Sequence, residues 1–110
     1  MKTINAEKVT KVLNWIIQHD DEMDAVIEPT LNKYGFYECS ITLPIIEKTI
    51  IGLGDRKIDS IENATSQASI LIDDYLANHP SEYVEDSSNE TYILEENDEG
   101  LLSMYIQIKH

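Results

Sequence analysis

The sequence is poor in cysteine and in long apolar runs, and both shortages limit what the protein can be. Cys39 is the single cysteine among 110 residues, so an intrachain disulfide or a zinc site built on several cysteines cannot form. No segment approaches the roughly 20 consecutive apolar residues that a membrane helix needs, and Lys and Glu interrupt the N-terminal stretch. These features predict a cytoplasmic protein that is not attached to a membrane.

Positive charge is also scarce, above all in the second half. Residues 58–108 hold twelve Asp and Glu but no Lys or Arg, and the whole chain carries a net charge of −13. Nucleic-acid binding depends on Lys and Arg that neutralise phosphates, so we do not expect it here. The charge instead favours cations or a basic protein partner, although it also has the simpler effect of keeping the protein soluble.

The bulk composition is that of a folded domain. Hydrophobic residues make up 42% of the chain, which is ordinary for a globular protein, and 110 residues is close to the commonest size of one domain. We therefore predict a single domain over residues 1–110.

Two segments have the periodicity of amphipathic helices. Residues 5–19 repeat apolar positions at spacings of three and four, and residues 60–78 do the same before Pro80 ends the pattern. Asp59 and Glu62 form an acidic version of a capping box for the second helix. Its small residues, Ala64 and Ala68, would let that helix lie close on a sheet. The apolar face of the first helix is formed by Val9, Val12, Leu13, Ile16 and Ile17.

Between these helices and after them, the pattern favours strands. Residues 20–35 first show a broken helical pattern, which predicts a second short helix kinked or started at Pro29 and ended before Gly35. Residues 36–43 alternate as a half-buried strand, and β-rich residues follow a tight turn or bulge at Pro44. The segment GLGDRK reads as a turn. Residues 91–96 and 101–109 then form a hairpin around Asn97–Gly100.

This order predicts the α+β class. We expect an antiparallel sheet of about four strands with helices on one face, in the order helix, short helix, two strands, helix, two strands.

The carboxylates of the last turn match a calcium-binding loop only in part. Glu95, Asn97, Glu99 and Gly100 fall at positions one, three, five and six of an EF-hand loop. Position twelve, which requires a bidentate Glu, is Ile106. We predict no metal and no cofactor.

Catalytic patterns are equally incomplete. The cluster from His19 to Glu22 lies at a helix end, where neighbouring side chains point in different directions. Cys39 is predicted on the inward face of a strand, as a small buried hydrophobe rather than a nucleophile. Gly52 and Gly54 lack the full spacing of a phosphate loop. Arg56 and Lys57 could hold an anion near a helix start, but a solvated turn explains them more simply. We predict a protein that is not an enzyme.

The remaining candidate is an acidic, tyrosine-containing face. Aromatic side chains among carboxylates suit contact with Arg or Lys of a partner. A cross-strand pair of Tyr92 with Tyr105 that stabilises the hairpin is an equally good account of those two residues. The predicted contact residues are Glu82, Tyr83, Glu85, Asp86, Glu90, Tyr92, Glu95, Glu96, Asp98 and Glu99.

The run IIGLGDRKIDSIENATSQASILIDDYL, about a quarter of the chain, resembles the second half of double-stranded-RNA-binding-like modules. It is also similar to the corresponding part of HicB-type antitoxins. Both resemblances imply a helix packed on an antiparallel sheet. RNA-binding modules place lysines at the helix start, where this chain has Ile61 and Glu62, so RNA binding is not implied. The DNA-binding segment usual in HicB-type antitoxins is not readable after residue 80.

We therefore predict a non-catalytic protein-binding module of the inhibitor, immunity, antitoxin or chaperone type, with an acidic face for a basic partner. One alternative is an enzyme or ligand-binding domain whose site is assembled from residues distant in sequence. Another is that the acidic residues serve only solubility, and that the last strand pairs with a second copy to form a homodimer.

Overall fold

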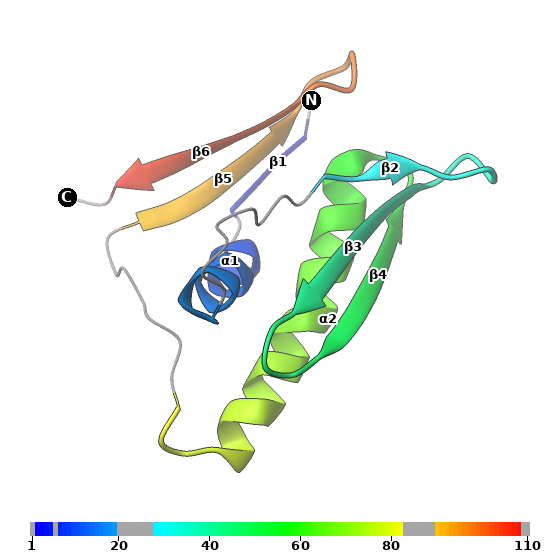
Figure 1. The fold of residues 1–110 in the computed structure, drawn as a ribbon. Coiled ribbons are helices and arrows are strands. Elements are labelled where there is room, and N and C mark those ends of the chain that lie inside the picture. The colour runs from blue at the N-terminus through cyan, green and yellow to red at the C-terminus, as the bar shows by residue number, and fades with distance from the viewer. Residues whose placement is uncertain (1, 6, 20–27, 83–89, 109–110) are drawn as a thin grey trace.

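A computed structural model describes residues 2–5, 7–19, 28–82 and 90–108 of the chain, and it confirms the α+β class (Figure 1). Both amphipathic helices and the C-terminal hairpin are present. The elements in chain order are β1 (Lys2–Asn5), α1 (Glu7–His19), β2 (Thr30–Leu31), β3 (Tyr37–Leu43), β4 (Lys48–Gly54), α2 (Lys57–Asn78), β5 (Glu90–Glu96) and β6 (Leu102–Ile108).

The strands form two sheets, and the prediction of one sheet of about four strands is wrong. One sheet has the order β1-β5-β6 and the other β2-β3-β4, and neighbouring strands in both are antiparallel. The helices lie between the sheets: α2 packs on β3 and β4, while α1 packs on α2 and contacts β5 (Figure 1). The two hairpins therefore belong to different sheets, each with a third strand that the sequence pattern did not predict.

The predicted short helix is wrong for the residues that the structure describes. Thr30 and Leu31 form β2, which pairs with Glu38 and Tyr37 of β3. Asn32 then closes a turn into β3, because its Oδ1 accepts hydrogen bonds from the backbone N–H groups of Tyr34 and Phe36. This side chain satisfies backbone donors outside a helix, which is how Asn favours turns. The rest of that prediction, residues 20–27, lies outside the described residues.

The close approach of α2 to the sheet is confirmed, and glycines on the strand side make it possible. Ala64 and Ala68 are fully buried. A Cβ atom added to Gly52 would lie 2.3 Å from the backbone nitrogen of Ala64, and one added to Gly54 would lie 2.5 Å from that of Ser60. Both glycines lie within β4, so the prediction that GLGDRK is entirely a turn is wrong.

The core joins both helices to both sheets, with α1 seated differently from its predicted face. Val9, Val12 and Leu13 are buried as expected, but Ile17 is 43% exposed. Trp15 is fully buried in its place, and its Nε1–H donates to the Pro44 carbonyl oxygen at 3.0 Å. The side chain of Trp15 therefore links α1 to the turn between β3 and β4.

The C-terminal hairpin is confirmed, but its register separates the two tyrosines that were candidates for a cross-strand pair. Tyr105 lies opposite Ile93, and Tyr92 lies opposite Ile106. Because successive residues alternate between the faces of a sheet, Tyr92 and Tyr105 belong to opposite faces. The pairing explanation for these tyrosines is therefore wrong.

Candidate functional site

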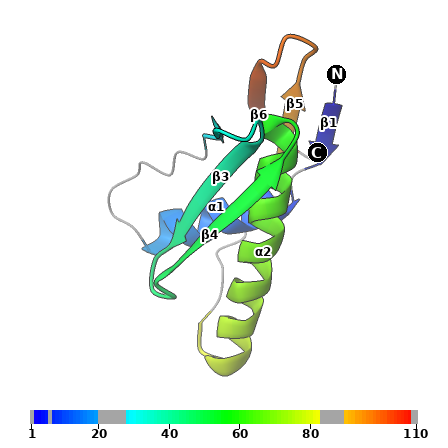
Figure 2. The same ribbon diagram turned by 90° about the vertical axis from the view of Figure 1, so that its right-hand side faces the viewer.

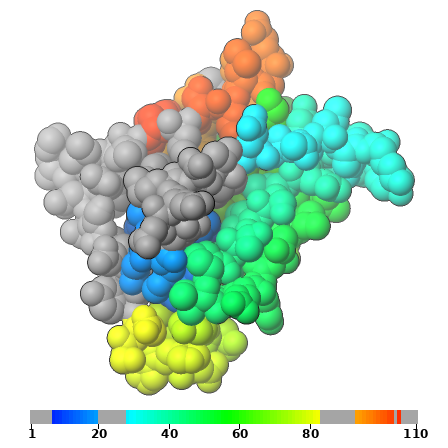
Figure 3. Space-filling model, in the orientation of Figure 1, coloured from blue at the N-terminus to red at the C-terminus, as the bar shows by residue number. Residues whose placement is uncertain are grey.

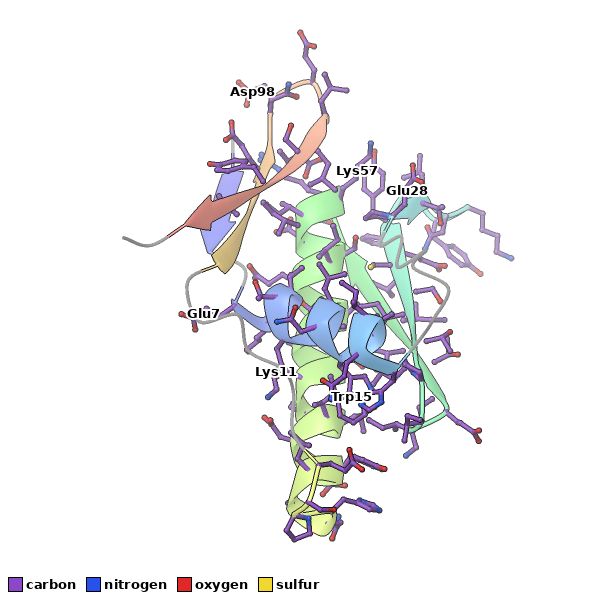
Figure 4. All side chains as sticks on the ribbon, turned by 60° about the vertical axis from the view of Figure 1, so that its left-hand side comes forward. Glu7, Lys11, Trp15, Glu28, Lys57 and Asp98 are labelled. Atoms are coloured by element: carbon purple, nitrogen blue, oxygen red, sulfur yellow. The ribbon has the colours of Figure 1, made fainter. Side chains whose placement is uncertain are left out.

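The described members of the predicted acidic face lie at two ends of the molecule. Glu82 follows the C-terminal end of α2, while Glu95, Asp98 and Glu99 lie in the β5–β6 hairpin, near the N-terminal end of α2 (Figures 1 and 4). A helix of 22 residues is about 33 Å long. Glu82 therefore does not share a patch with the hairpin carboxylates. Glu90 and Tyr92 belong to β5, and Tyr83, Glu85 and Asp86 lie outside the described residues.

The hairpin turn directs two of its carboxylates to solvent. Asn97 organises the turn, because its Oδ1 accepts hydrogen bonds from the N–H groups of Glu99 and Leu101 at 3.0 and 2.9 Å. Gly100 has a φ of 81°, a conformation that glycine adopts without strain. Asp98 and Glu99 are exposed as a result, and Glu95 is half-buried at the end of β5. These three carboxylates are the hairpin cluster.

Glu96 does not belong to that cluster, because its side chain is only 3% exposed. Its Oε1 accepts a hydrogen bond from the backbone N–H of Ile58 at 3.2 Å, in the first turn of α2. A carboxylate at this place satisfies a free N–H group and interacts favourably with the helix dipole. Glu96 is therefore excluded from the proposed contact surface, and it ties the hairpin to the start of α2.

The structure also corrects the predicted start of α2. The helix begins at Lys57 rather than at residue 60, and its N-cap residue, Arg56, makes no side-chain capping hydrogen bond. The predicted capping box of Asp59 and Glu62 is wrong, since those residues lie inside the helix. The Glu96 carboxylate already lies at the first turn of α2, where Arg56 and Lys57 were considered as an anion site. A bound anion would therefore have to compete with it.

Glu96→Ala is expected to lower the free energy of unfolding by about 2 kcal/mol, because the N–H of Ile58 becomes a buried donor without a partner. Glu96→Gln should cost about 1 kcal/mol, since an amide oxygen can accept that bond but lacks the charge that favours the helix dipole. Urea unfolding followed by circular dichroism measures both. Glu95→Gln, one residue away and half-buried, should change stability by less than about 0.5 kcal/mol. Equal losses at both positions would contradict the capping role.

Folding supplies cations to carboxylates of the second half. Lys11 of α1, which is labelled in Figure 4, forms an ion pair with Asp73 of α2. Lys8 Nζ donates to Ser66 Oγ at 3.4 Å. The sequence shows no Lys or Arg within residues 58–108, but the fold brings Lys side chains of α1 to this segment. Both contacts join exposed side chains at the edge of the interface between α1 and α2. An ion pair in such an exposed position contributes little stability.

The other side chains that the sequence offered as metal ligands are engaged in hydrogen bonding or ring packing in the structure. The side-chain oxygen of Asn97 already holds the turn. The ring of His19 lies 4.2 Å from that of Trp15, and His79 stacks on Tyr75 with ring centroids 4.0 Å apart. Within the described ranges, no group of three or more His, Cys, Asp and Glu side chains is placed to hold a metal ion. Asp20, Asp21 and Glu22 lie outside those ranges.

Cys39 is confirmed as an inward-facing residue of β3. It is fully buried, and burial raises the pKa of its thiol to about 11. The thiolate is the reactive form of cysteine. At pH 8 a pKa of about 11 leaves roughly one thiol in a thousand ionised, so nucleophilic chemistry at this position is suppressed.

Cys39 is therefore expected to react with a thiol reagent such as dithionitrobenzoate at least about 100-fold more slowly in the native protein than in urea at pH 8. A pKa of 9.0 for the unfolded thiol gives about 100 times more thiolate than the native value does. Because the native pKa is the higher one, stability should fall as pH rises from 9 towards 11. Labelling of the native protein at the unfolded rate would show that β3 exposes this thiol.

Comparison of the chain with family models, with curated proteins and with solved structures finds no match. The resemblances to RNA-binding-like modules and HicB-type antitoxins therefore stay predictions. No helix in the described part of the chain is both long enough and apolar enough to cross a membrane.

Proposed function

We propose that the protein is a non-catalytic binding module that presents the hairpin cluster, Glu95, Asp98 and Glu99, to a basic protein partner. The observation that carries this proposal is the combination of charge and placement. Asp98 and Glu99 lie on a turn fixed by Asn97, and Glu95 lies at the end of β5, next to Glu96, which is anchored to α2. The charged groups are therefore held on a rigid support, which lowers the entropy cost of binding.

Electrostatic attraction determines how such a surface acts on the association rate of a partner. Exposed carboxylates attract a basic partner over about one Debye length, roughly 8 Å at physiological salt. They raise the association rate more than they lower the dissociation rate. The net charge of −13 adds a long-range field of the same sign. The module would act by covering a basic surface of its partner, as inhibitors, immunity proteins, antitoxins and chaperones do.

The proposal is tested by capture of a partner with immobilised wild-type protein and two variants that lose equal charge. Glu95→Gln/Asp98→Asn/Glu99→Gln neutralises the hairpin cluster, and Glu28→Gln/Glu47→Gln/Asp55→Asn neutralises three carboxylates elsewhere. We expect wild type and the second variant to retain the same basic protein from a lysate of the source organism at about 50 mM salt, and to release it at about 500 mM.

The association rate of that captured protein is then measured directly. The hairpin variant should associate at least about tenfold more slowly at low salt and with a flatter salt dependence, while the control variant stays within a factor of about two. Equal rates for both variants would show that charge in general, and not the hairpin cluster, attracts the partner. Retention of no basic protein by wild type would reject the proposal.

A further inference from the structure

Exposed hydrophobic side chains gather on the β2-β3-β4 sheet and its turns. Ile51 is 56% exposed and Leu53 is 50% exposed, although both belong to a strand that packs on α2. Apolar patches that a folded protein leaves in water commonly mark contact surfaces. The large hydrophobic residues exposed between residues 28 and 57 are Leu31, Tyr34, Phe36, Ile45, Ile51 and Leu53.

The register explains why Ile51 and Leu53 lie on the outer face of this sheet. Ile41 and Ile50 lie opposite each other and are buried against α2. Ile51 lies opposite Ser40, one residue out of phase, so its side chain points away from the helix. Figure 2 looks onto this outer face, where β3 and β4 lie in front of α1 and no described element covers them. Figure 3 shows the same sheet forming one side of the molecular surface.

The charge of this region differs from that of the remaining molecule. Residues 28–57 contain four acidic and four basic residues, so the entire net charge of −13 lies outside them. The carboxylate on the outer face, that of Glu38, accepts a hydrogen bond from Asn32 at 3.0 Å. Two copies of the chain repel each other wherever their acidic parts meet. The outer face of this sheet belongs to a segment without net charge and exposes Ile51 and Leu53 beside Ser40, Thr42 and Thr49, so two copies can meet there without that cost.

We propose that the outer face of the β2-β3-β4 sheet, centred on Ile51 and Leu53, is a self-association surface on which a second copy of this chain packs face to face. Burial of apolar surface from both copies would drive association. Facing sheets pack about 10 Å apart through interdigitated side chains, and the outward Ile51 and Leu53 supply such side chains on each copy.

Packing through faces is favoured over pairing of strand edges. The free edge of β4 is partly covered, because Gln67 Nε2 donates to the Ile51 carbonyl oxygen at 3.4 Å and to Asn63 Oδ1 at 2.7 Å. A helix side chain that already binds a carbonyl oxygen of the edge strand opposes addition of another strand there. At the other sheet, β6 is an edge strand. However, β6 pairs with β5, which has three carboxylates and no Lys or Arg, so pairing two β6 strands would bring the like charges of the neighbouring β5 strands closer.

Self-association and binding of a basic partner should respond to salt in opposite ways. Salt screens the repulsion between two acidic copies and so strengthens the dimer, whereas it weakens attraction between the hairpin cluster and a basic protein. Sedimentation equilibrium of the full chain at about 50 and 500 mM salt measures the first effect alone. The self-association proposal can thus fail while the proposed function stands, and the reverse also holds.

The decisive variants place a carboxylate on equally exposed apolar positions. Ile51→Glu, or Leu53→Glu in its place, should raise the dimer dissociation constant at least about tenfold, because a charge is then buried against an identical charge. Ile70→Glu is the matched control, since Ile70 is 68% exposed on α2, and it should leave the constant within a factor of about two. Circular dichroism verifies that each variant is folded.

Three results would overturn the proposal. Wild type could sediment as a monomer at both salt concentrations, which would show that the face stays in water. Ile51→Glu and Ile70→Glu could weaken the dimer equally, which would make the effect one of net charge. Tyr105→Glu, at an exposed residue of β6, could abolish a dimer that Ile51→Glu leaves intact, which would assign the contact to the β1-β5-β6 sheet.

Discussion

Gly52→Ala is expected to lower the free energy of unfolding by about 3 kcal/mol, although it adds a single methyl group. The new Cβ would lie 2.3 Å from the Ala64 nitrogen and 2.6 Å from the Ser60 carbonyl oxygen. Both are backbone atoms of α2, so no side-chain rotation can relieve the overlap. The helix would have to move away from β4, and the buried contacts of Ala64 and Ala68 would loosen with it.

The expected sign of the stability change makes Gly52→Ala an informative test. The φ of Gly52 is not positive, so its backbone suits alanine, and Gly→Ala at such positions commonly stabilises by about 0.4–1 kcal/mol through the unfolded state. Only the closeness of α2 reverses that expectation. Urea unfolding followed by circular dichroism measures the change, with constant m-values as evidence that the folded state is retained.

Gly35→Ala is the matched control. Gly35 has a φ of 86° and no atom within 4 Å of an added Cβ, so the substitution should cost about 1 kcal/mol from backbone conformation alone. A Gly52→Ala protein as stable as wild type, or a loss no larger than that of Gly35→Ala, would mean that α2 does not lie on β4 at this distance.

Local sequence pattern predicted the elements whose hydrophobic period is long enough to read. The alternation in β3 and the spacing along α1 and α2 each extend over several turns or residue pairs, and those elements are present. By contrast, β1 and β2 contain four and two residues, too few for a period to be recognised. The number of sheets depends on these short strands and on partners far apart in sequence, such as Ile4 with Leu94. Local reasoning therefore gave the class but not the division into two sheets.

The candidate site shows the same limit at the level of single residues. The cap of α2 comes from Glu96, which is 38 residues from Ile58 in the chain, so no local capping pattern could reveal it. One signal for its burial was present in the sequence. Glu96 is two residues after Leu94, and the alternation of a strand places both on the same face. A charge count over residues 58–108 makes adjacent carboxylates equivalent, whereas the strand turns Glu95 and Glu96 to opposite faces.

The two proposed surfaces give different binding functions to residues 28–57 and to the hairpin cluster. Residues 28–57 contribute a neutral, partly apolar face that can meet a second copy, and the hairpin cluster contributes charge for a basic partner. Because α2 packs on β3 and β4 and is capped by Glu96 from β5, it connects both surfaces rigidly. A dimer formed through the neutral face would then carry two hairpin clusters, and binding to a partner with two basic sites would gain from multivalency.

Trp15→Ala is expected to lower the free energy of unfolding by about 3–5 kcal/mol, because it leaves a large cavity in the core. Trp15 is fully buried in the second half of α1 (Figure 4), and its ring centroid lies 5.4 Å from that of Tyr75 in an edge-on arrangement. Such aromatic contacts contribute beyond the buried area alone. The substitution would thus remove packing between α1 and α2 and also the hydrogen bond to the turn at Pro44.

Trp15→Phe separates these two contributions. Phenylalanine fills much of the volume but donates no hydrogen bond, so the Pro44 carbonyl oxygen keeps only the hydrogen bond from the Ile46 N–H, and the loss should be about 0.5–1.5 kcal/mol. Ile17→Ala, on the same helix and 43% exposed, should cost about 0.5 kcal/mol. Circular dichroism must report the unfolding, because Trp15 is the single tryptophan of the chain. If Trp15→Ala cost no more than Ile17→Ala, α1 would not be seated on α2 through this side chain, and the core would have to close in another way.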